Sequence, residues 1–560
     1  MNNSEIFTEQ AEYLSVKAFT DWSTSVHNEA IIIRKLSQSG AKLITGPRGC
    51  GKTTLLLKVY NNLIQNSDLS TLPIYVNFKS SLKLEPLYKT NPNAAFWFNQ
   101  WLLYKVFQGL YTSIVEFKID ISASKPLLNS VEKAINNLEL GKIDSSDQTN
   151  TTISELIDVI NSYLEKTKKS RCVILLDDAG HAFSSEQQHD FFEFFREIKT
   201  KTISPKAAVY PGVTSYSSSF HIGHDAEEID VWLKPNSEGY LNFMHSLLKT
   251  RLGNDAYVQL SSNISLLNII CFASYGIPRA LLNMIAEFNE ESDDIKSLNL
   301  KLTAKGVLAA IKNNYNNTYS IFDTLRIKLP MYSNFIATGS NVYENCLRII
   351  KEFNKRNTVL KQSSIIAIKR PISSEMNKVI GFFQYAGLIS SHGISNRGGK
   401  GVYELYELHY SAIIDRNAFF SSRGINFENY CEAFENRPNH HYPRHTENGI
   451  LQALDTSKMF ALALPPCPVC NTPRLSEESK FCSNCGAKLK NISIFESIVS
   501  QGIENLPITQ NRSQTIKANS KISSIKDILM DTDNRQLFKV PQIGPYWANR
   551  IKTYAEEFIA

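Results

Sequence analysis

The stretch that most constrains this chain is GPRGCGKTT at residues 46–54, which matches the pattern G-x-x-x-x-G-K-[ST]. It follows the apolar pair Leu43-Ile44 and precedes the largely apolar run LLLKVY at residues 55–60. This context predicts a buried strand, a phosphate-binding loop and then a helix. In such a loop the glycines let backbone N–H groups surround a β-phosphate, and the helix start adds its positive dipole end. A chance glycine-rich turn is the alternative, but it does not explain the flanking strand and helix.

Two side chains of this loop carry the expected chemistry. We expect the Lys52 ammonium to reach the β and γ oxygens of a nucleoside triphosphate and the Thr53 hydroxyl to ligate Mg²⁺. The other loop residues predicted to bind the nucleotide are Gly46, Pro47, Arg48, Gly49, Cys50, Gly51 and Thr54. The loop therefore predicts ATP and Mg²⁺ as cofactors.

Length and composition limit the class of protein. A chain of 560 residues is long enough for several domains, because single cores stop growing near ~250 to 300 residues. No apolar run approaches the ~18 residues of a membrane span, and the first residues lack a basic and then apolar leader. Of nine cysteines, four form one cluster and five are scattered, which suits a reducing compartment. We expect a soluble, cytoplasmic protein without a membrane segment.

A second motif lies at residues 171–179, RCVILLDDA, where an apolar run ends in two acidic residues. A buried parallel strand of this kind presents its carboxylates beside the phosphates of a P-loop protein. We expect Asp177 to hold the Mg²⁺ shell and Asp178 to polarise the attacking water as general base. A solvated acidic turn is the alternative reading.

Further strands and a helical segment complete the first half of the chain. Apolar runs predict strands at residues 72–78, 207–215 and 228–233. The polar end of the second, at Thr214 and Ser215, is placed either to sense a γ-phosphate or to form a turn. The sequence GIPR at residues 276–279 puts a proline in the first turn of an apolar helix. In a lid over the nucleotide, Arg279 would meet the γ-phosphate, since a guanidinium suits phosphate geometry.

Together these motifs resemble an AAA+ ATPase of the origin-recognition and replication-initiator type, and related ATPases of bacterial defence. The resemblance covers roughly residues 25–320. It implies an α/β fold with a five-strand parallel sheet and a helical lid, and catalytic roles for Lys52, Asp178 and Arg279. The chain departs from this family in two places. Asp178 stands where a glutamate is commoner, and this replacement would slow hydrolysis. The residue position that senses the γ-phosphate at the end of the fourth strand lacks the usual asparagine. No arginine finger can be fixed from the sequence.

The second half of the chain is expected to carry smaller modules. The expected division is a P-loop core (1–235), a lid (236–340), a winged-helix-like domain (341–425), a linker (426–464), a zinc ribbon (465–490), a second linker (491–521) and a helix-hairpin-helix-like module (522–560).

The charge and the sequence pattern of residues 341–425 indicate nucleic-acid binding. Residues 341–425 contain 12 Lys and Arg against 6 Asp and Glu, so the excess equals the whole chain's net charge of +6. A local basic excess is a marker of nucleic-acid binding. Helices followed by a glycine-tipped hairpin resemble a winged helix, with Asn377 and Lys378 facing a groove and Arg397 and Lys400 meeting phosphates. Many winged helices mediate protein contacts instead.

Two C-terminal motifs have recognisable spacing. Cys467 and Cys470, then Cys482 and Cys485, form two CxxC pairs that can close a tetrahedron around Zn²⁺, and they resemble a zinc ribbon. Residues 540–551 resemble a helix-hairpin-helix, in which the turn at Gly544 exposes backbone N–H groups to a DNA phosphate. Arg550 and Lys552 add positive charge there. A plain helical pair is the alternative for this segment.

These features predict an enzyme, a slow ATPase stimulated by DNA or a partner. Its nucleotide state would control self-association and DNA binding. One alternative is an ATP-dependent signalling switch in bacterial antiviral defence that acts with a separate effector protein. Another keeps ATP as a structural ligand of a scaffold.

Overall fold

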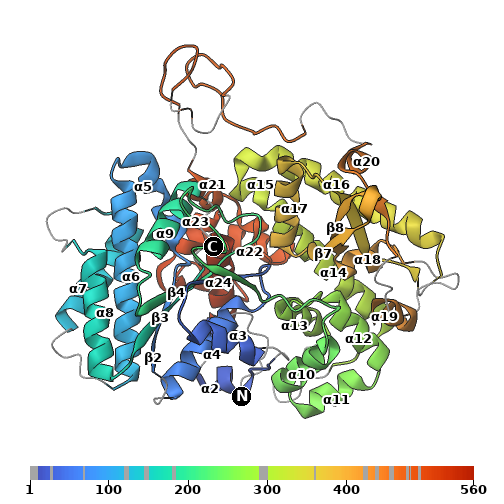
Figure 1. Ribbon diagram of the computed structural model, residues 1–560, viewed down its shortest axis with the longest axis horizontal. Coiled ribbons are helices and arrows are strands. Elements are labelled where there is room, and N and C mark those ends of the chain that lie inside the picture. Colours follow the sequence, from blue (N-terminus) through green and yellow to red (C-terminus); the bar gives the residue numbers. More distant parts are fainter. Residues whose placement is uncertain are drawn as a thin grey trace.

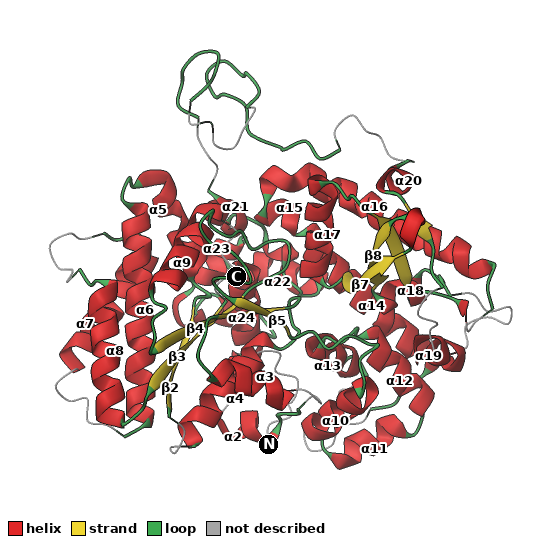
Figure 2. Cartoon of the chain, viewed as in Figure 1, coloured by secondary structure: helices red, strands yellow, loops and turns green. Residues whose placement is uncertain are grey.

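The computed structural model describes the chain except for residues 1–10, 15, 26–28, 67–69, 119–124, 144–149, 179–183, 289–299, 359–360, 420–426, 436–440, 453–458, 475–478, 480, 490–492 and 560. An α/β core lies on one side of the molecule, a helical region with a smaller sheet lies on the other, and the C-terminal helices lie between them (Figure 1). The strands fall into two separate groups (Figure 2).

The core sheet has five parallel strands in the order β2-β3-β4-β1-β5. The strands are β1 (Lys42–Thr45), β2 (Thr71–Asn77), β3 (Arg171–Asp177), β4 (Ile203–Ala208) and β5 (Glu227–Asp230). Alternate residues of β3 point to opposite faces: Cys172, Ile174 and Leu176 pack in one apolar cluster, and Val173 and Leu175 in another. The predicted five-strand parallel sheet is therefore confirmed.

Helices cover both faces of this sheet. One face carries α5 (Glu85–Thr90), α6 (Ala94–Glu116), α7 (Lys125–Glu139), α8 (Ile153–Thr167) and α9 (Ser185–Glu197), and the other carries α3 (Glu29–Ser37) and α4 (Lys52–Gln65). Short helices η1 (Ala11–Tyr13) and α2 (Val16–Asp21) precede them, and η2 (Ser81–Leu84) follows β2. A capping box begins α8, in which Thr152 and Glu155 satisfy each other's backbone N–H groups.

The strand predicted at residues 207–215 lies earlier in the chain. β4 begins at Ile203 and ends at Ala208, and residues 211–213 form a turn. Ser204, Pro205 and Lys206 obscure the apolar pattern at its start, although all three are buried. Pro211-Gly212 lies in the turn that follows, where Gly212 takes a φ of 72°.

The lid is helical, as predicted. It consists of α10 (Tyr240–Leu252), α11 (Asn254–Ser261), α12 (Ile264–Ala273), α13 (Pro278–Ala286), α14 (Ala304–Asp323), α15 (Leu325–Lys328) and η4 (Pro330–Tyr332). Pro278 occupies the first turn of α13. The next helix, α16 (Ser333–Lys355), runs without a break across the boundary expected at residue 340.

A four-strand sheet in the order β7-β8-β6-β9 follows the lid. It combines β6 (Ile365–Lys369), β7 (Ile389–Asn396), β8 (Val402–Leu408) and β9 (Arg444–His445), with α17 (Ser374–Ala386), η6 (Gly398–Lys400) and α18 (Tyr410–Asp415) around it. The predicted hairpin is present as antiparallel β7 and β8. A single helix, α17, lies between β6 and β7.

Both expected linkers contain folded structure. In residues 426–464, α19 (Phe427–Glu435) packs on α12, and β9 and α20 (Glu447–Leu451) join the small sheet domain. The sequence did not predict these two helices and this strand because they are short.

Residues 491–521 differ from the prediction in the same way. They supply α21 (Ile494–Val499), η7 (Ile503–Asn505) and α22 (Gln510–Asn519), which share one apolar core with α23 (Ile525–Met530), η8 (Thr532–Asn534), η9 (Leu537–Lys539) and α24 (Pro545–Ile559). Ile498, Ile503 and Ile516 are buried in that core. Residues 493–559 are called the C-terminal module below.

Candidate nucleotide site and zinc site

The loop between β1 and α4 has the backbone that a phosphate cradle requires. Gly46, Gly49 and Gly51 have φ values of 155°, 84° and 101°, which side chains other than glycine rarely adopt. A Cβ on Gly46 would also lie 2.6 Å from the Cys50 sulfur. The glycines that sequence analysis assigned to the loop are therefore required by its geometry.

Lys52 lies inside this loop and contacts it directly. Its Nζ donates to the carbonyl oxygens of Gly46 at 2.7 Å and Pro47 at 3.0 Å. The ammonium also lies 3.7 Å from the centre of the Tyr210 ring. Burial lowers the pKa of Lys52. The two carbonyl contacts hold the ammonium where phosphate oxygens would enter the loop.

The two acidic residues at the end of β3 have different surroundings. Asp177 is buried, and its Oδ2 accepts from the Tyr75 hydroxyl at 2.8 Å. Burial and the neighbouring charge of Asp178 raise the pKa of Asp177 to about 7, while hydrogen bonds from Tyr75 and Thr53 oppose that rise. The Thr53 hydroxyl and the Asp177 carboxylate are hard oxygen donors in contact, so this pair fits Mg²⁺.

Asp178 takes a φ of 52°, which turns the chain sharply after the strand. Its Oδ1 accepts from the Tyr210 hydroxyl at 3.1 Å. Tyr210 therefore contacts both Lys52 and Asp178 from the loop that follows β4. Thr214 and Ser215, weighed as γ-phosphate sensors, are absent from the described lining of the cavity, whereas Tyr210 is present there. The reason is that β4 ends seven residues before Ser215.

One cavity of about 230 Å³ joins these groups. Polar and charged groups in its lining come from residues 48–54, Asp178 and Arg279, among others. Its lining also includes the apolar and aromatic residues Phe19, Trp22, Phe243, Leu247 and Leu282. The Arg251 guanidinium lies 4.9 Å from the Trp22 ring centre. The lining therefore offers contacts both for phosphates and for a flat base.

Arg279 lies at the second position of α13, beside the phosphate loop. A Cβ on Gly49 would be 3.4 Å from the Arg279 Cβ, so lid and loop are closely packed. Its Nη1 pairs with the Glu557 carboxylate of α24 at 3.4 Å. The Arg48 Nη2 donates to the Glu557 carbonyl at 2.8 Å. Sequence analysis missed Glu557, because nothing local marks a residue near the chain end as part of this site.

Residues 111–387, from within α6 to just past the end of α17, match the family model described as ORC-CDC6-like. This part of the chain is therefore similar to that family. The ORC-CDC6-like region includes Asp177, Asp178 and Arg279 and begins after the phosphate loop. The predicted resemblance to AAA+ ATPases of the origin-recognition and replication-initiator type is confirmed. No curated protein matches the chain in sequence.

Solved structures with low overall similarity include three replication proteins. The Aeropyrum pernix Orc1 protein in complex with DNA has a TM-score of 0.30 and 13% identity, covering 74% of this chain and 95% of its own. Domain III of the Thermotoga maritima replication initiation protein DnaA has a TM-score of 0.27 and 13% identity, covering 56% and 98%. Cdc6p from Pyrobaculum aerophilum has a TM-score of 0.24 and 11% identity, covering 72% and 98%.

Membrane-spanning potential is confined to one bent helix pair in the described residues. No single helix there has the length and apolar character to cross a bilayer. Only α11 and α12 taken together pass that test, and they meet at an angle of 102°.

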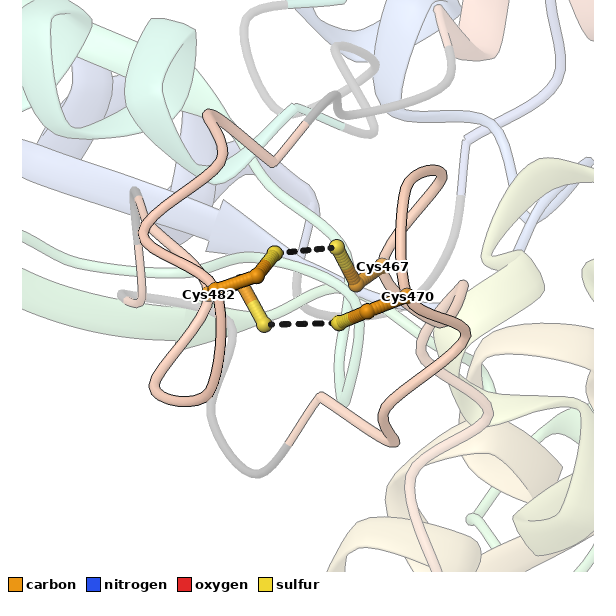
Figure 3. Close-up of side chains that lie close together, drawn as sticks. Cys467, Cys470 and Cys482 are labelled. Carbon is orange, nitrogen blue, oxygen red and sulfur yellow. Dashed lines mark hydrogen bonds between the residues drawn. The ribbon is translucent and has the colours of Figure 1, made fainter.

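The four cysteines of the predicted zinc ribbon converge on one point (Figure 3). Their sulfurs all lie within 4.8 Å of one another, and the pairs Cys467–Cys485 and Cys470–Cys482 are 3.5 Å apart. Four thiolates around Zn²⁺ at ~2.3 Å require sulfur separations of roughly 3.8 Å. Hydrogen bonding by Thr472 lowers the pKa of Cys470 to about 5. The cluster therefore fits a closed, structural zinc site.

We expect purified protein to contain about one zinc per chain, because four thiolates close the coordination sphere. Replacing Cys482 by serine should remove most of the metal and increase proteolysis between residues 467 and 485. Nucleotide affinity should stay unchanged, since the cluster lies in a segment that projects from the body of the molecule (Figure 1). Metal analysis checks the first point, and zinc-free wild-type protein would reject the ribbon assignment.

The structure separates the residues predicted to contact nucleic acid into three places. Asn377 is exposed on α17 and donates to the Ile372 carbonyl at 3.2 Å, while the Lys378 ammonium lies 5.1 Å from the Tyr332 ring centre. Arg397 and Lys400 lie at the hairpin tip, and Gly544 and Arg550 lie in the C-terminal module. Their DNA contacts stay predictions.

The helix that carries Asn377 packs against the nucleotide core at its other end. The Arg48 N–H donates to the Tyr385 carbonyl at 3.3 Å. Gly381 of α17 meets the backbone of Gly212, where a Cβ on either glycine would be within 2.6 Å of the other residue. This contact requires glycine on both sides, and the hydrogen bond from Arg48 to Tyr385 places α17 beside the phosphate loop.

Proposed function

We propose that this protein binds and hydrolyses ATP and that its nucleotide state controls assembly and DNA binding. The observation that supports this best is the arrangement of Lys52, Thr53, Asp178 and Arg279 around one cavity, with Asp177 hydrogen-bonded to Thr53. These residues come from α4, the end of β3 and the lid. Only a ligand with several negative charges and a bound cation would use all of them at once.

Each residue has a role in this proposal. Lys52 exchanges the loop carbonyls for β- and γ-phosphate oxygens, and Thr53 and Asp177 hold Mg²⁺, whose charge would stabilise the transferred phosphoryl group. Asp178 orients a water and accepts its proton, while Tyr210 fixes the Asp178 carboxylate by the hydrogen bond at 3.1 Å. Arg279 neutralises charge on the γ-phosphate from the lid side.

Two observations support DNA as a partner. The domain after the lid carries the chain's entire net positive charge, with 12 basic against 6 acidic residues over 341–425. The resemblance to origin-recognition proteins, which is supported by the family match over residues 111–387, indicates the same class of partner. Self-association and a cytoplasmic location belong to the same proposal. The alternative is a defence switch with a separate effector protein, and the following experiment distinguishes it from a DNA-controlled ATPase.

The test is the ATP hydrolysis rate with and without duplex DNA, at low and at moderate salt. We expect DNA to stimulate hydrolysis and added salt to remove the stimulation, because phosphate contacts by Lys and Arg release counterions. A rate in the wild type equal to that of the Lys52→Ala protein would reject the ATPase. Turnover that DNA does not change at either salt concentration would favour a switch triggered by another protein.

A further inference from the structure

The last helix of the chain ends at the nucleotide cavity. Glu557 of α24 lines that cavity together with the phosphate loop. Its carboxylate pairs with Arg279 Nη1 at 3.4 Å, and its backbone carbonyl accepts from Arg48 Nη2 at 2.8 Å. The side chains of Arg279 and Glu557 are 27% and 16% exposed, so the pair is largely shielded from water.

A third cation lies close to the same carboxylate. Lys328, at the end of α15, is buried and lies 5.9 Å from the ring centre of Phe558. Burial and the nearby charge of Arg48 lower the pKa of Lys328, and the charge of Glu557 opposes this fall. The Glu557 carboxylate pairs with Arg279 and lies near the charges of Arg48 and Lys328, and such a group of basic side chains also suits a phosphate.

The C-terminal module is held to the core at a second point. Glu85 of α5 accepts from the Ser493 hydroxyl at 2.5 Å and from the Phe495 N–H at 3.3 Å. Leu82 of the core and Ile327 of α15 pack in the module's apolar cluster. The module therefore bridges the ATPase core and the end of the lid, and Glu557 is the part of it that enters the nucleotide site.

We propose that Glu557 is an intramolecular latch that competes with the γ-phosphate of ATP for Arg279. This inference rests on the proposed function. With no γ-phosphate, the carboxylate keeps α24 docked on the phosphate loop and lid. When ATP engages Arg279, the pair breaks and the end of α24 is released, together with the DNA-binding residues predicted in the module.

Two consequences follow from this competition. ATP should release α24 more strongly than ADP, because only ATP carries the phosphate that needs Arg279. Anything that pulls the module away from the core should raise ATP affinity by the same factor, since coupling between two sites is reciprocal. Binding of DNA to the module would act in this way.

The experiment compares full-length Glu557→Gln with wild type and with Glu556→Gln. Glu556 is the neighbouring residue on the same helix and is absent from the described lining of the cavity. Apparent affinity falls with the fraction of molecules that are closed to the ligand, so loosening the latch should lower the Kd for a fluorescent ATP analogue about three- to tenfold. Glu556→Gln should bind as wild type does. Hydrogen exchange of residues 545–559 gives a second readout.

Three results are distinguishable. Tighter binding by Glu557→Gln alone, with faster exchange of residues 545–559 in wild type on adding ATP than ADP, would support the latch. Measurable and equal affinity in all three proteins would overturn the latch and leave the ATP-binding proposal standing. No binding by any of them would reject the proposed function and the latch with it, because the latch requires a competing nucleotide.

Discussion

Replacing Lys52 by alanine should reduce ATP turnover by at least about 100-fold, since removing a preorganised positive charge at the phosphoryl oxygens costs that much or more. The residue is buried, and its ammonium is already directed to the loop by two carbonyl oxygens and the Tyr210 ring. ATP binding should weaken together with turnover. Phosphate release and binding of a fluorescent nucleotide measure the two effects separately.

The control for this variant is Lys312→Ala, which removes an exposed lysine from α14. It changes the net charge equally and should keep wild-type turnover. A Lys52→Ala protein that is folded, by circular dichroism, and hydrolyses ATP at the wild-type rate would exclude the phosphate loop from catalysis. The contacts of Lys52 to the loop would then have only a structural role.

Replacing Asp178 by asparagine should lower turnover by about 10²- to 10⁴-fold, the usual contribution of a general base. ATP binding should persist, because Lys52, Thr53 and Asp177 are unchanged. The variant should also fold: asparagine tolerates a left-handed backbone well, and residue 178 has a φ of 52°. The amide oxygen can still accept from Tyr210. Single-turnover hydrolysis and nucleotide binding together check this expectation.

Tyr210→Phe is the matched variant for this second prediction. It removes the hydroxyl that donates to Asp178 but keeps the ring next to the Lys52 ammonium. We expect a smaller loss of turnover than in Asp178→Asn, because the carboxylate remains and only its orientation is less fixed. Full turnover in Asp178→Asn would show that another group accepts the proton.

The geometry of the candidate nucleotide residues was predictable because local sequence determines it. A P-loop needs glycine where φ is positive, and an apolar strand that ends in two acids places them at the edge of a parallel sheet. The four-cysteine cluster was predictable for a similar reason, since CxxC spacing brings two sulfurs together within one short turn. The capping box that begins α8 is equally local.

The end of β4 and the two expected linkers were not predictable in the same way. Buried Lys206 and Pro205 do not resemble a strand interior, and Lys206 is accommodated because its Nζ donates to the Gln38 carbonyl at 2.8 Å. Likewise, α21 and α22 are short, and their few apolar residues become a core only when α23 and α24 pack over them. Short helices gain most of their stability from such packing.

By itself, the sequence determined that this chain has a phosphate loop, an acidic strand end, a helical lid and a four-cysteine cluster. Only the tertiary structure decided that Tyr210 joins Lys52 to Asp178 and that Glu557 faces Arg48 and Arg279. The physical reason is separation along the chain: the Arg48–Glu557 hydrogen bond joins residues 509 positions apart. Contacts of that kind depend on how whole domains pack, and no local pattern of residues records them.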